Sequence, residues 1–410
     1  MESAAFWMLC AYLMFEYVRP QSVYPAIDVL PWPILSLILT AVTVFFDKSV
    51  KWVSSTETPL FLGFFMIVLL SGVFAFRSSL SWAQIDVVIN WLLVYFLVIN
   101  IVNTEKRFFI FILFFLLASF KMSQHGFMTF ARRGFSFADW GAVGGPGWFH
   151  NSGEFAIQMT IFVPLSICFI LCLRNYWGRI KKIFFYMMPV TGLVSVVATS
   201  SRGAQLAIVV AGAWFVLKNK LGIKALLGMA VLGIALYLFL PEEQMERIRE
   251  MGQDETSLQR LAYWNFGLDV IADHPLLGIG YSNWVNYCYF INPQGLGVLA
   301  KCEVCHNIFI QAASELGIPG LLVFILMALS VFVINARTRN YARQAENKFL
   351  IYMAHGLDGG LIGYLVSGFF VTVLFYPFFW VQMSMTVALN AIARSQVGTQ
   401  QKPGGLSCKE

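Results

Sequence analysis

The sequence predicts an all-α integral membrane protein with about twelve transmembrane helices. Of its 410 residues, 58% are hydrophobic and only 12% are charged, whereas a soluble domain carries roughly 25% charged residues. The chain also contains 39 Phe and 12 Trp, which suits a protein whose main solvent is lipid. A water-soluble globular enzyme is therefore excluded. The net charge of +6 is explained by the Lys and Arg residues that mark the cytoplasmic loops of membrane proteins. We therefore expect no nucleic-acid partner.

Twelve apolar runs, each bounded by charged residues or by Gly and Pro, are the candidate spans. They lie at residues 4–18, 32–46, 59–76, 85–102, 108–120, 154–173, 183–199, 204–217, 221–240, 318–336, 349–370 and 375–393. Several are shorter than the ~20 residues that an upright helix needs to cross a bilayer, so we expect these helices to be tilted or re-entrant.

The distribution of Lys and Arg sets the orientation, because positively charged loops stay in the cytoplasm. With a cytoplasmic N-terminus, 18 of the 28 Lys and Arg residues fall in cytoplasmic segments. Both termini are then cytoplasmic. The chain divides into spans 1–9 with a Gly-rich outer loop at 121–153 (residues 1–240), a large outer loop (241–317), spans 10–12 (318–394) and a cytoplasmic tail (395–410).

The apolar stretch 183–217 is too long for one helix. Its 35 residues would make a helix of about 52 Å, whereas the hydrocarbon core is ~30 Å thick. The lysines at its two ends, Lys181 and Lys218 among them, belong on the same side of the membrane, which requires a hairpin with its turn at 200–203. Arg202 then lies at or below the outer headgroups, where an arginine needs an anionic partner. Lipid phosphates are the alternative partner.

The large outer loop contains a helix over residues 257–272. Asp254 to Ser257 supply N-cap residues, and His274-Pro275 ends the helix. Arg260 lies off the apolar row of this helix, so its side chain can point into a cavity. The alternative is that Arg260 pairs with Asp254 or Glu255.

His306-Asn307 precedes a second helix in this loop. The nine residues 308–316 end at Gly317, with Pro319 close behind, which places His306 at the helix N-terminus, near the membrane surface. A neutral histidine can accept a proton near pH 7, as a general base must when a sugar hydroxyl attacks an activated carbon. A purely structural histidine is the alternative.

The first outer loop is rich in Gly and therefore irregular. Its polar and aromatic residues could bind sugars or phosphate, and its Trp and Phe could equally belong to the interfacial aromatic belt. These residues are Arg132, Arg133, Trp148, Phe149, His150, Asn151 and Glu154.

Three of the seven cysteines, Cys288, Cys302 and Cys305, lie in the large outer loop, where an oxidising compartment would allow one disulfide, of Cys288 with Cys302 or with Cys305. Residues 302–306 also spell the C-x-x-C-H pattern of haem attachment. Apart from His274 and scattered Met, no second axial ligand is close in the sequence, so we expect no haem. We also expect no bound metal, because these potential zinc ligands form a single tight cluster.

The motif that contains His306, in the large outer loop, resembles the signature of a known protein family. His306-Asn307, nine residues, Gly317 and Gly320 are similar to the signature of the bacterial O-antigen ligase superfamily, which includes O-antigen polymerases and protein O-glycosylation ligases. Gly278 to Tyr281 and Ser201-Arg202-Gly203 also look like that family, as does a large outer loop before the last three spans. In architecture the resemblance covers the whole chain, with about twelve spans and cytoplasmic ends, and O-antigen ligase is the nearest type.

This resemblance implies a glycosyltransferase C type fold in the bacterial inner membrane, with a periplasmic active site. It also implies glycan transfer from undecaprenyl diphosphate to a hydroxyl of the lipid A core, without metal, nucleotide or other cofactor. His306 would be the catalytic base, and Arg202 and Arg260 would bind the diphosphate. Candidate substrate-binding residues are Arg132, Arg133, His150, Asn151, Glu154 and Asn307. Glu315 is a doubtful partner for His306, because it can face elsewhere.

Other functions stay open at this point. The motifs do not separate a ligase from an O-antigen polymerase or a protein O-oligosaccharyltransferase, which differ only in the acceptor. A lipid-glycan or solute transporter belongs to another class and should show repeats and paired ionisable residues at mid-membrane. Only His355 and Asp358 suit that role, and Asp358 is better explained as a hydrogen-bonding residue of the helix bundle.

Overall fold

The computed structural model describes residues 2–136, 141–218, 249, 252, 254–293, 295 and 301–400. All regular structure within these ranges is helical, which confirms the predicted all-α class. The predicted span at 221–240 lies outside the described residues.

The first half of the chain forms helices at the predicted spans and two short helices, α2 and α5, that were not predicted; residues 141–150 before α8 are irregular. The helices are α1 (Ala4–Leu13), continued by a π-helical turn (Met14–Val18), α2 (Pro20–Val23), α3 (Trp32–Val44), α4 (Glu57–Val73), α5 (Ser78–Ala83), α6 (Ile85–Ile101), α7 (Glu105–Arg132) and α8 (Ser152–Leu173).

The second half supplies the hairpin, the helices of the outer segment and the last spans. These helices are α9 (Arg179–Ala198), α10 (Arg202–Lys218), α13 (Glu255–Asp273), α14 (Trp284–Ile291), α15 (Ile308–Gln344), α16 (Lys348–Gly368) and α17 (Pro377–Gln400). Gly317 interrupts α15 with a φ of 74°, so residues 308–316 form a separate first segment, as the sequence predicts.

Among the described residues, five helices are long and apolar enough to cross a membrane: α7, α8, α9, α15 and α16. Three shorter apolar helices, α3, α4 and α6, accompany them. The protein is therefore a multi-pass membrane protein. Fewer helices meet these criteria than the twelve predicted, partly because α1 and α10 have only 10 and 17 residues.

Helix α7 is longer than the sequence analysis predicts, and it takes in the first part of the expected outer loop. Lys121, Gln124 and His125 resemble loop residues, but they lie on the exposed face of the helix. Met122 and Phe130 lie eight residues apart on the buried face, and this helical spacing continues the apolar side to Arg132. Helix α7 packs against α9 along this length.

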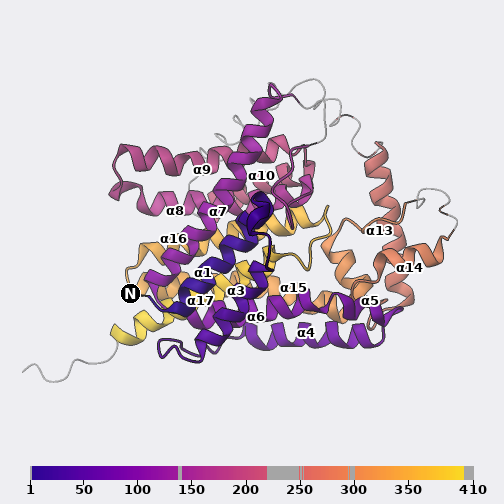
Figure 1. Cartoon of the computed structure of the whole chain (residues 1–410), viewed down its shortest axis with the longest axis horizontal. Coiled ribbons are helices and arrows are strands. Elements are labelled where there is room, and N and C mark those ends of the chain that lie inside the picture. Colours follow the sequence, from indigo (N-terminus) through magenta and orange to yellow (C-terminus); the bar gives the residue numbers. More distant parts are fainter. Residues whose placement is uncertain are drawn as a thin grey trace, which may run out of the picture.

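The helices form one bundle whose two ends differ (Figure 1). The chain begins at one end of the bundle, where α17 also ends, and α13 and α14 lie at the opposite end. Helix α16 packs against α8 and α10, while α15 packs against α17 and α4. Helix α13 packs on α15 and runs across the direction of α4 and α15 (Figure 1).

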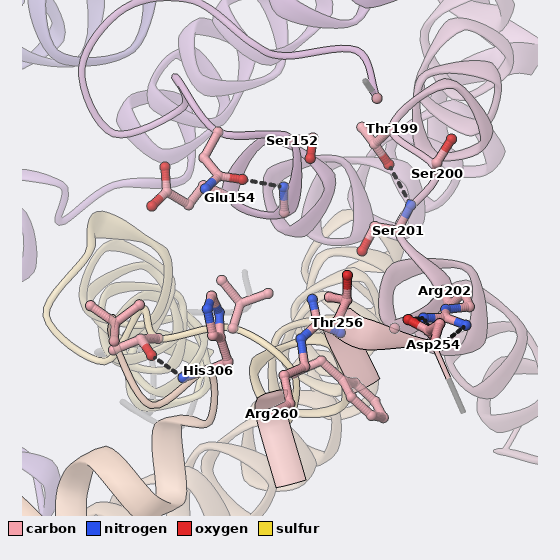
Figure 2. Close-up of a pocket in the computed structure, with 18 of the residues that line it drawn as sticks. Ser152, Glu154, Thr199, Ser200, Ser201, Arg202, Asp254, Thr256, Arg260 and His306 are labelled. Atoms are coloured by element: carbon pink, nitrogen blue, oxygen red, sulfur yellow. Dashed lines mark hydrogen bonds and ion pairs between the residues drawn. The ribbon is translucent and has the colours of Figure 1, made fainter. Parts of the chain in front are cut away.

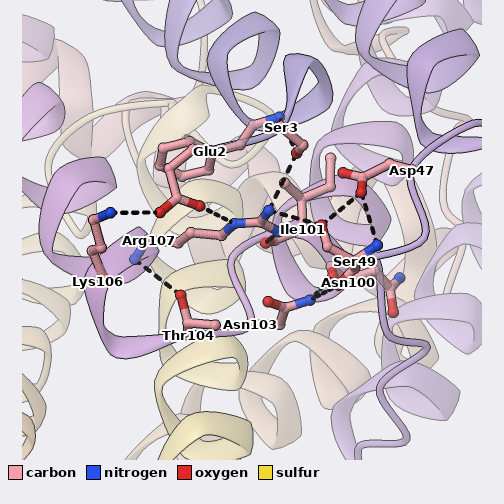
Figure 3. A network of polar contacts seen from close by, with 11 residues as sticks. Glu2, Ser3, Asp47, Ser49, Asn100, Ile101, Asn103, Thr104, Lys106 and Arg107 are labelled. Atoms are coloured by element: carbon pink, nitrogen blue, oxygen red, sulfur yellow. Dashed lines mark hydrogen bonds and ion pairs between the residues drawn. The ribbon is translucent and has the colours of Figure 1, made fainter.

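The end of the bundle that carries the N-terminus is fastened by Arg107 (Figure 3). Its Nε donates to Glu2 Oε2 at 2.8 Å, its Nη1 to the carbonyl oxygen of Ile101 at 3.0 Å and its Nη2 to Ser49 Oγ at 2.7 Å. One buried guanidinium thus ties the N-terminus, the α3–α4 connection and the end of α6 to the start of α7.

A second buried ion pair joins α15 to α16. Arg339 Nη1 donates to Asp358 Oδ2 at 2.5 Å, and Asn335 Nδ2 donates to Asp358 Oδ1 at 2.8 Å. Asp358 is therefore held within the bundle by polar partners, as expected for a residue that fastens helices.

Candidate functional site

A cavity of about 530 Å³ opens near the α13 end of the bundle (Figure 2). Six segments form its walls: Gly141 in the α7–α8 connection, the start of α8, the α9–α10 turn, the start of α13, the segment before α15 and the α16–α17 connection. Its lining residues include Asn151, Glu154, Ser201, Arg202, Asp254, Glu255, Arg260, His306, Phe370, Thr372 and Tyr376.

Arg202 enters the cavity as the first residue of α10. The predicted hairpin is confirmed, with Ser200 in the turn at a left-handed φ of 54°. The Nη1 and Nη2 atoms of Arg202 donate to Asp254 Oδ2 and Oδ1 at 3.2 and 3.1 Å. Asp254 also caps α13 by accepting from the Ser257 backbone N–H at 3.1 Å. The anionic partner expected for Arg202 is therefore a side chain of the protein.

The electrostatics of Asp254 follow from these bonds. Burial alone would raise the pKa of this carboxyl, but hydrogen bonds from Ser257 and Arg202 outweigh burial, so the pKa lies below its usual value. Asp254 therefore stays ionised and offsets the charge of Arg202.

Arg260 lies in the second turn of α13 and points into the same cavity (Figure 2). Its Nε is buried and has no hydrogen-bond partner among the described residues. Within the same part of the chain, no ion pair joins it to Asp254 or Glu255. Burial and the neighbouring Arg202 lower the pKa of its guanidinium. The side chain thus presents a charge that an anionic ligand can neutralise.

His306 is held at the cavity wall by its backbone. Its φ of 52° is left-handed, which is uncommon for a residue other than glycine, and its N–H donates to Thr372 Oγ1 at 2.6 Å. Burial, followed by the positive charge of Arg260, lowers the pKa of the imidazole to about 4. The ring is therefore neutral near pH 7 and has a nitrogen lone pair available.

The disulfide joins Cys288 to Cys302 and so ties α14 to the segment before His306. Cys305 stays a buried thiol whose Sγ donates to the carbonyl oxygen of Asn307 at 3.3 Å, and burial raises its pKa to about 12. Because Cys302 is engaged in the disulfide, the C-x-x-C-H segment does not offer two thiols to a haem. Among the described residues, no group of three or more His, Cys, Asp or Glu is arranged to hold a metal ion.

Asn151 and Glu154, at the start of α8, also line the cavity. Asn151 caps α8, and Glu154 Oε1 accepts a hydrogen bond from the Tyr376 hydroxyl at 2.8 Å. His150 does not line the cavity, but its Nδ1 lies 3.6 Å from Glu154 Oε2.

The family comparison covers this site. Residues 187–325 match the O-antigen ligase family, a range that includes Arg202, Arg260 and His306. The chain carries an O-antigen ligase domain. The protein is accordingly a membrane enzyme with an O-antigen ligase domain, and this domain implies lipid-linked glycans as substrates. No curated protein matches the chain.

Several predicted site residues of this enzyme lie outside the cavity. Arg132 and Arg133 are exposed at the end of α7 and do not line the cavity, because α7 continues beyond its predicted end. Asn307 is buried as the N-cap of α15, with its Oδ1 accepting from the N–H groups of Phe309 and Ile310. Phe149 is fully buried, so it belongs neither to a sugar platform nor to an interfacial belt.

Glu315 also lies outside the cavity. It is buried, and its Oε1 accepts from the Trp284 backbone N–H at 3.4 Å. It therefore contacts the start of α14, which agrees with the doubt that it could partner His306.

The α16–α17 connection was not predicted as part of the site from the sequence. Phe370, Thr372 and Tyr376 from this connection line the cavity. The segment has no charged residue and no glycine between Gly368 and Pro377, so nothing in its pattern distinguishes it from a short loop between two spans.

Proposed function

We propose that the protein transfers a glycan from undecaprenyl diphosphate to a hydroxyl of the lipid A core oligosaccharide. The observation that carries this proposal is the convergence of Arg202, Arg260 and His306, all within the O-antigen ligase domain, on one cavity. A cationic site beside a neutral imidazole suits the transfer of a sugar from a diphosphate leaving group to a hydroxyl.

The two arginines have unequal roles in donor binding. Arg260 supplies the principal positive charge for the diphosphate, because Asp254 already offsets the charge of Arg202. Guanidinium groups bind phosphate oxygens in a bidentate manner, and they stabilise the negative charge that the leaving group gains as its bond to the sugar breaks. In this proposal the charge is stabilised by side chains, without a metal ion.

His306 acts as the base. The acceptor oxygen bonds to the anomeric carbon as the bond from that carbon to the diphosphate oxygen breaks, with inversion, and the hydroxyl proton passes to the imidazole. The electron pair of the broken bond leaves with undecaprenyl diphosphate. A bound diphosphate also offsets the charge of Arg260 that lowers the pKa of His306, so donor binding strengthens the base.

We further propose that the cavity faces the periplasm and that both termini face the cytoplasm. The distribution of Lys and Arg supports this orientation, as does the location of the N-terminus and the end of α17 opposite α13 and α14 (Figure 1). The disulfide between Cys288 and Cys302 fits an oxidising compartment.

The test is reconstitution of the purified protein with undecaprenyl-diphosphate-linked glycan and lipid A core, comparing the wild type with His306→Ala. We expect the wild type to attach glycan to the core and the variant to lose this activity. Lengthening of the lipid-linked glycan without transfer to the core would identify a polymerase. Absence of both products, with a protein acceptor also inactive, would overturn the proposal.

A further inference from the structure

Glu154 and Tyr376 form a polar pair in the cavity wall that the transfer chemistry proposed above does not use. Glu154 lies in the first turn of α8 and is only 7% exposed. The Tyr376 hydroxyl donates a hydrogen bond to Glu154 Oε1 at 2.8 Å. The second carboxylate oxygen of Glu154, Oε2, has no hydrogen-bond partner among the described residues.

We propose that this pair forms a subsite for the hydroxyl groups of a neutral sugar and that the subsite holds the acceptor glycan. Because the hydroxyl hydrogen of Tyr376 is donated to Glu154, the phenol oxygen has only lone pairs left to offer to the cavity. Such an oxygen binds a hydrogen-bond donor, which a sugar hydroxyl is and an ionised phosphate is not. The inference rests on the proposed function, because it assigns the second substrate of the same cavity.

The charge distribution separates the two substrates. Figure 2 shows Arg260 between His306 and the pair of Arg202 and Asp254, with Glu154 toward the His306 side of the cavity. An anionic diphosphate is attracted to Arg260, because Asp254 offsets the charge of Arg202, and it is repelled by the Glu154 carboxylate. The Glu154 side is therefore left for a substrate whose recognised groups carry no charge.

The α16–α17 connection couples this subsite to the base. Thr372, which accepts the hydrogen bond from the His306 backbone N–H, lies four residues before Tyr376 in the same connection. The segment that binds the acceptor hydroxyls therefore also fixes the backbone of the base. This arrangement favours the acceptor over the donor sugar as the occupant, because the acceptor is the substrate that His306 must deprotonate.

Packing restricts the movement of the Tyr376 ring. Trp148 packs edge-on against it, with ring centroids 4.7 Å apart, and Trp148 Nε1 donates to Glu16 Oε1. A phenol held in this way loses little side-chain entropy when it binds a sugar, so its hydroxyl contributes directly to acceptor affinity.

The test compares Tyr376→Phe and Glu154→Leu with the wild type in nanodiscs, measuring KM separately for the lipid-linked donor and for the lipid A core acceptor. We expect both variants to raise the acceptor KM about tenfold and to leave the donor KM unchanged. Tyr289→Phe removes a hydroxyl from an exposed tyrosine of α14 and is the matched control, with both KM values at the wild-type level. An unchanged acceptor KM in both variants, or a parallel rise in donor KM, would overturn the subsite.

A binding measurement separates failure of the subsite from failure of the proposed function. Saturation-transfer NMR with dephosphorylated core oligosaccharide reports binding whether or not transfer occurs. Binding to the wild type that is lost in Tyr376→Phe supports the subsite even if no glycan is transferred. Absence of binding to the wild type overturns the subsite. The Tm of Tyr376→Phe, measured alongside, should match that of the wild type. If Tyr376→Phe has a lower Tm, Glu154→Leu serves as the independent variant for the same comparison.

Discussion

Asp254 binds both terminal nitrogens of Arg202, at 3.2 and 3.1 Å, and this pairing assigns different roles to the two arginines of the cavity. Arg202 links the α9–α10 hairpin to the start of α13 through the carboxylate that caps α13. Arg260 lies about one and a half turns further along α13. Its buried Nε has no hydrogen-bond partner among the residues that the structure describes. The first arginine therefore contributes to the shape of the site, and the second contributes most of its attraction for an anion.

Replacing Arg260 should affect catalysis without unfolding the protein. We expect Arg260→Gln to lower kcat/KM for the lipid-linked donor by about 100-fold, because it removes hydrogen-bond donors that stabilise the departing diphosphate. Steady-state transfer assays in nanodiscs measure this change. Arg133→Gln, at an exposed arginine outside the cavity, is the control and should retain wild-type kinetics.

Replacing Arg202 should give a different pattern. Arg202→Gln removes the ion pair to Asp254, so we expect a lower Tm as well as reduced transfer, whereas Arg260→Gln should keep the wild-type Tm. Asp254→Asn should reproduce the lower Tm of Arg202→Gln, because it breaks the same pair and weakens the α13 cap. Equal Tm values for the wild type and both variants of this pair would contradict the structural role of Arg202.

The pH dependence of transfer should reflect the low pKa of His306. The base must be neutral, and its pKa is about 4, so kcat/KM should hold as the pH falls below 6 and decline only as it passes through about 4. In Arg260→Gln the pKa of His306 should rise, because one of the charges that lower it is gone. It should remain below the ordinary value of ~6.5, because burial is the larger cause.

This shift is measurable as the acid limb of the pH profile of kcat/KM, which reports groups of the free enzyme. The limb should move to higher pH in Arg260→Gln and stay in place in the control variant Arg133→Gln. An acid limb near 6.5 in the wild type would show that the imidazole is not buried beside Arg260 as described.

The helical fold was largely predictable from the sequence, because apolar runs in lipid must form helices. The hairpin at Arg202, the helix that carries Arg260 and the break at Gly317 also follow from local rules of length, capping and glycine conformation. The extension of α7 did not follow, because polar residues such as Lys121 and Gln124 occupy the exposed face of a helix whose buried face stays apolar.

The pairing within the site was harder to predict. Asp254 precedes Arg260 by six residues and follows Arg202 by 52, so sequence proximity favoured the wrong partner for this carboxylate. Thr372 and Tyr376 belong to a short connection with no charge pattern. Their roles depend on tertiary contacts with His306 and Glu154, which no local pattern encodes.

The disulfide should stabilise the segment before His306. Cys288 and Cys302 are separated by 14 residues, and closing a loop of this length contributes about 3 kcal/mol in the chain-entropy model. We expect Cys288→Ser with Cys302→Ser to lower the Tm and to increase hydrogen exchange in α14 and in the segment before His306. Cys305→Ser should leave the exchange of both segments unchanged, because Cys305 takes no part in the bridge.

Thr372 should act as a positioning residue for His306 through the 2.6 Å bond between its Oγ1 and the histidine N–H. That bond supports a left-handed backbone, so its loss should let the imidazole depart from its productive position. We expect Thr372→Val, which keeps the shape but removes the hydroxyl, to lower kcat about tenfold with little change in donor KM. Thr372→Ser should restore kcat, because it returns the accepting oxygen. If the serine and valine variants had the same kcat, the effect would come from packing of the side chain, and the hydrogen bond to His306 would have no part in positioning the base.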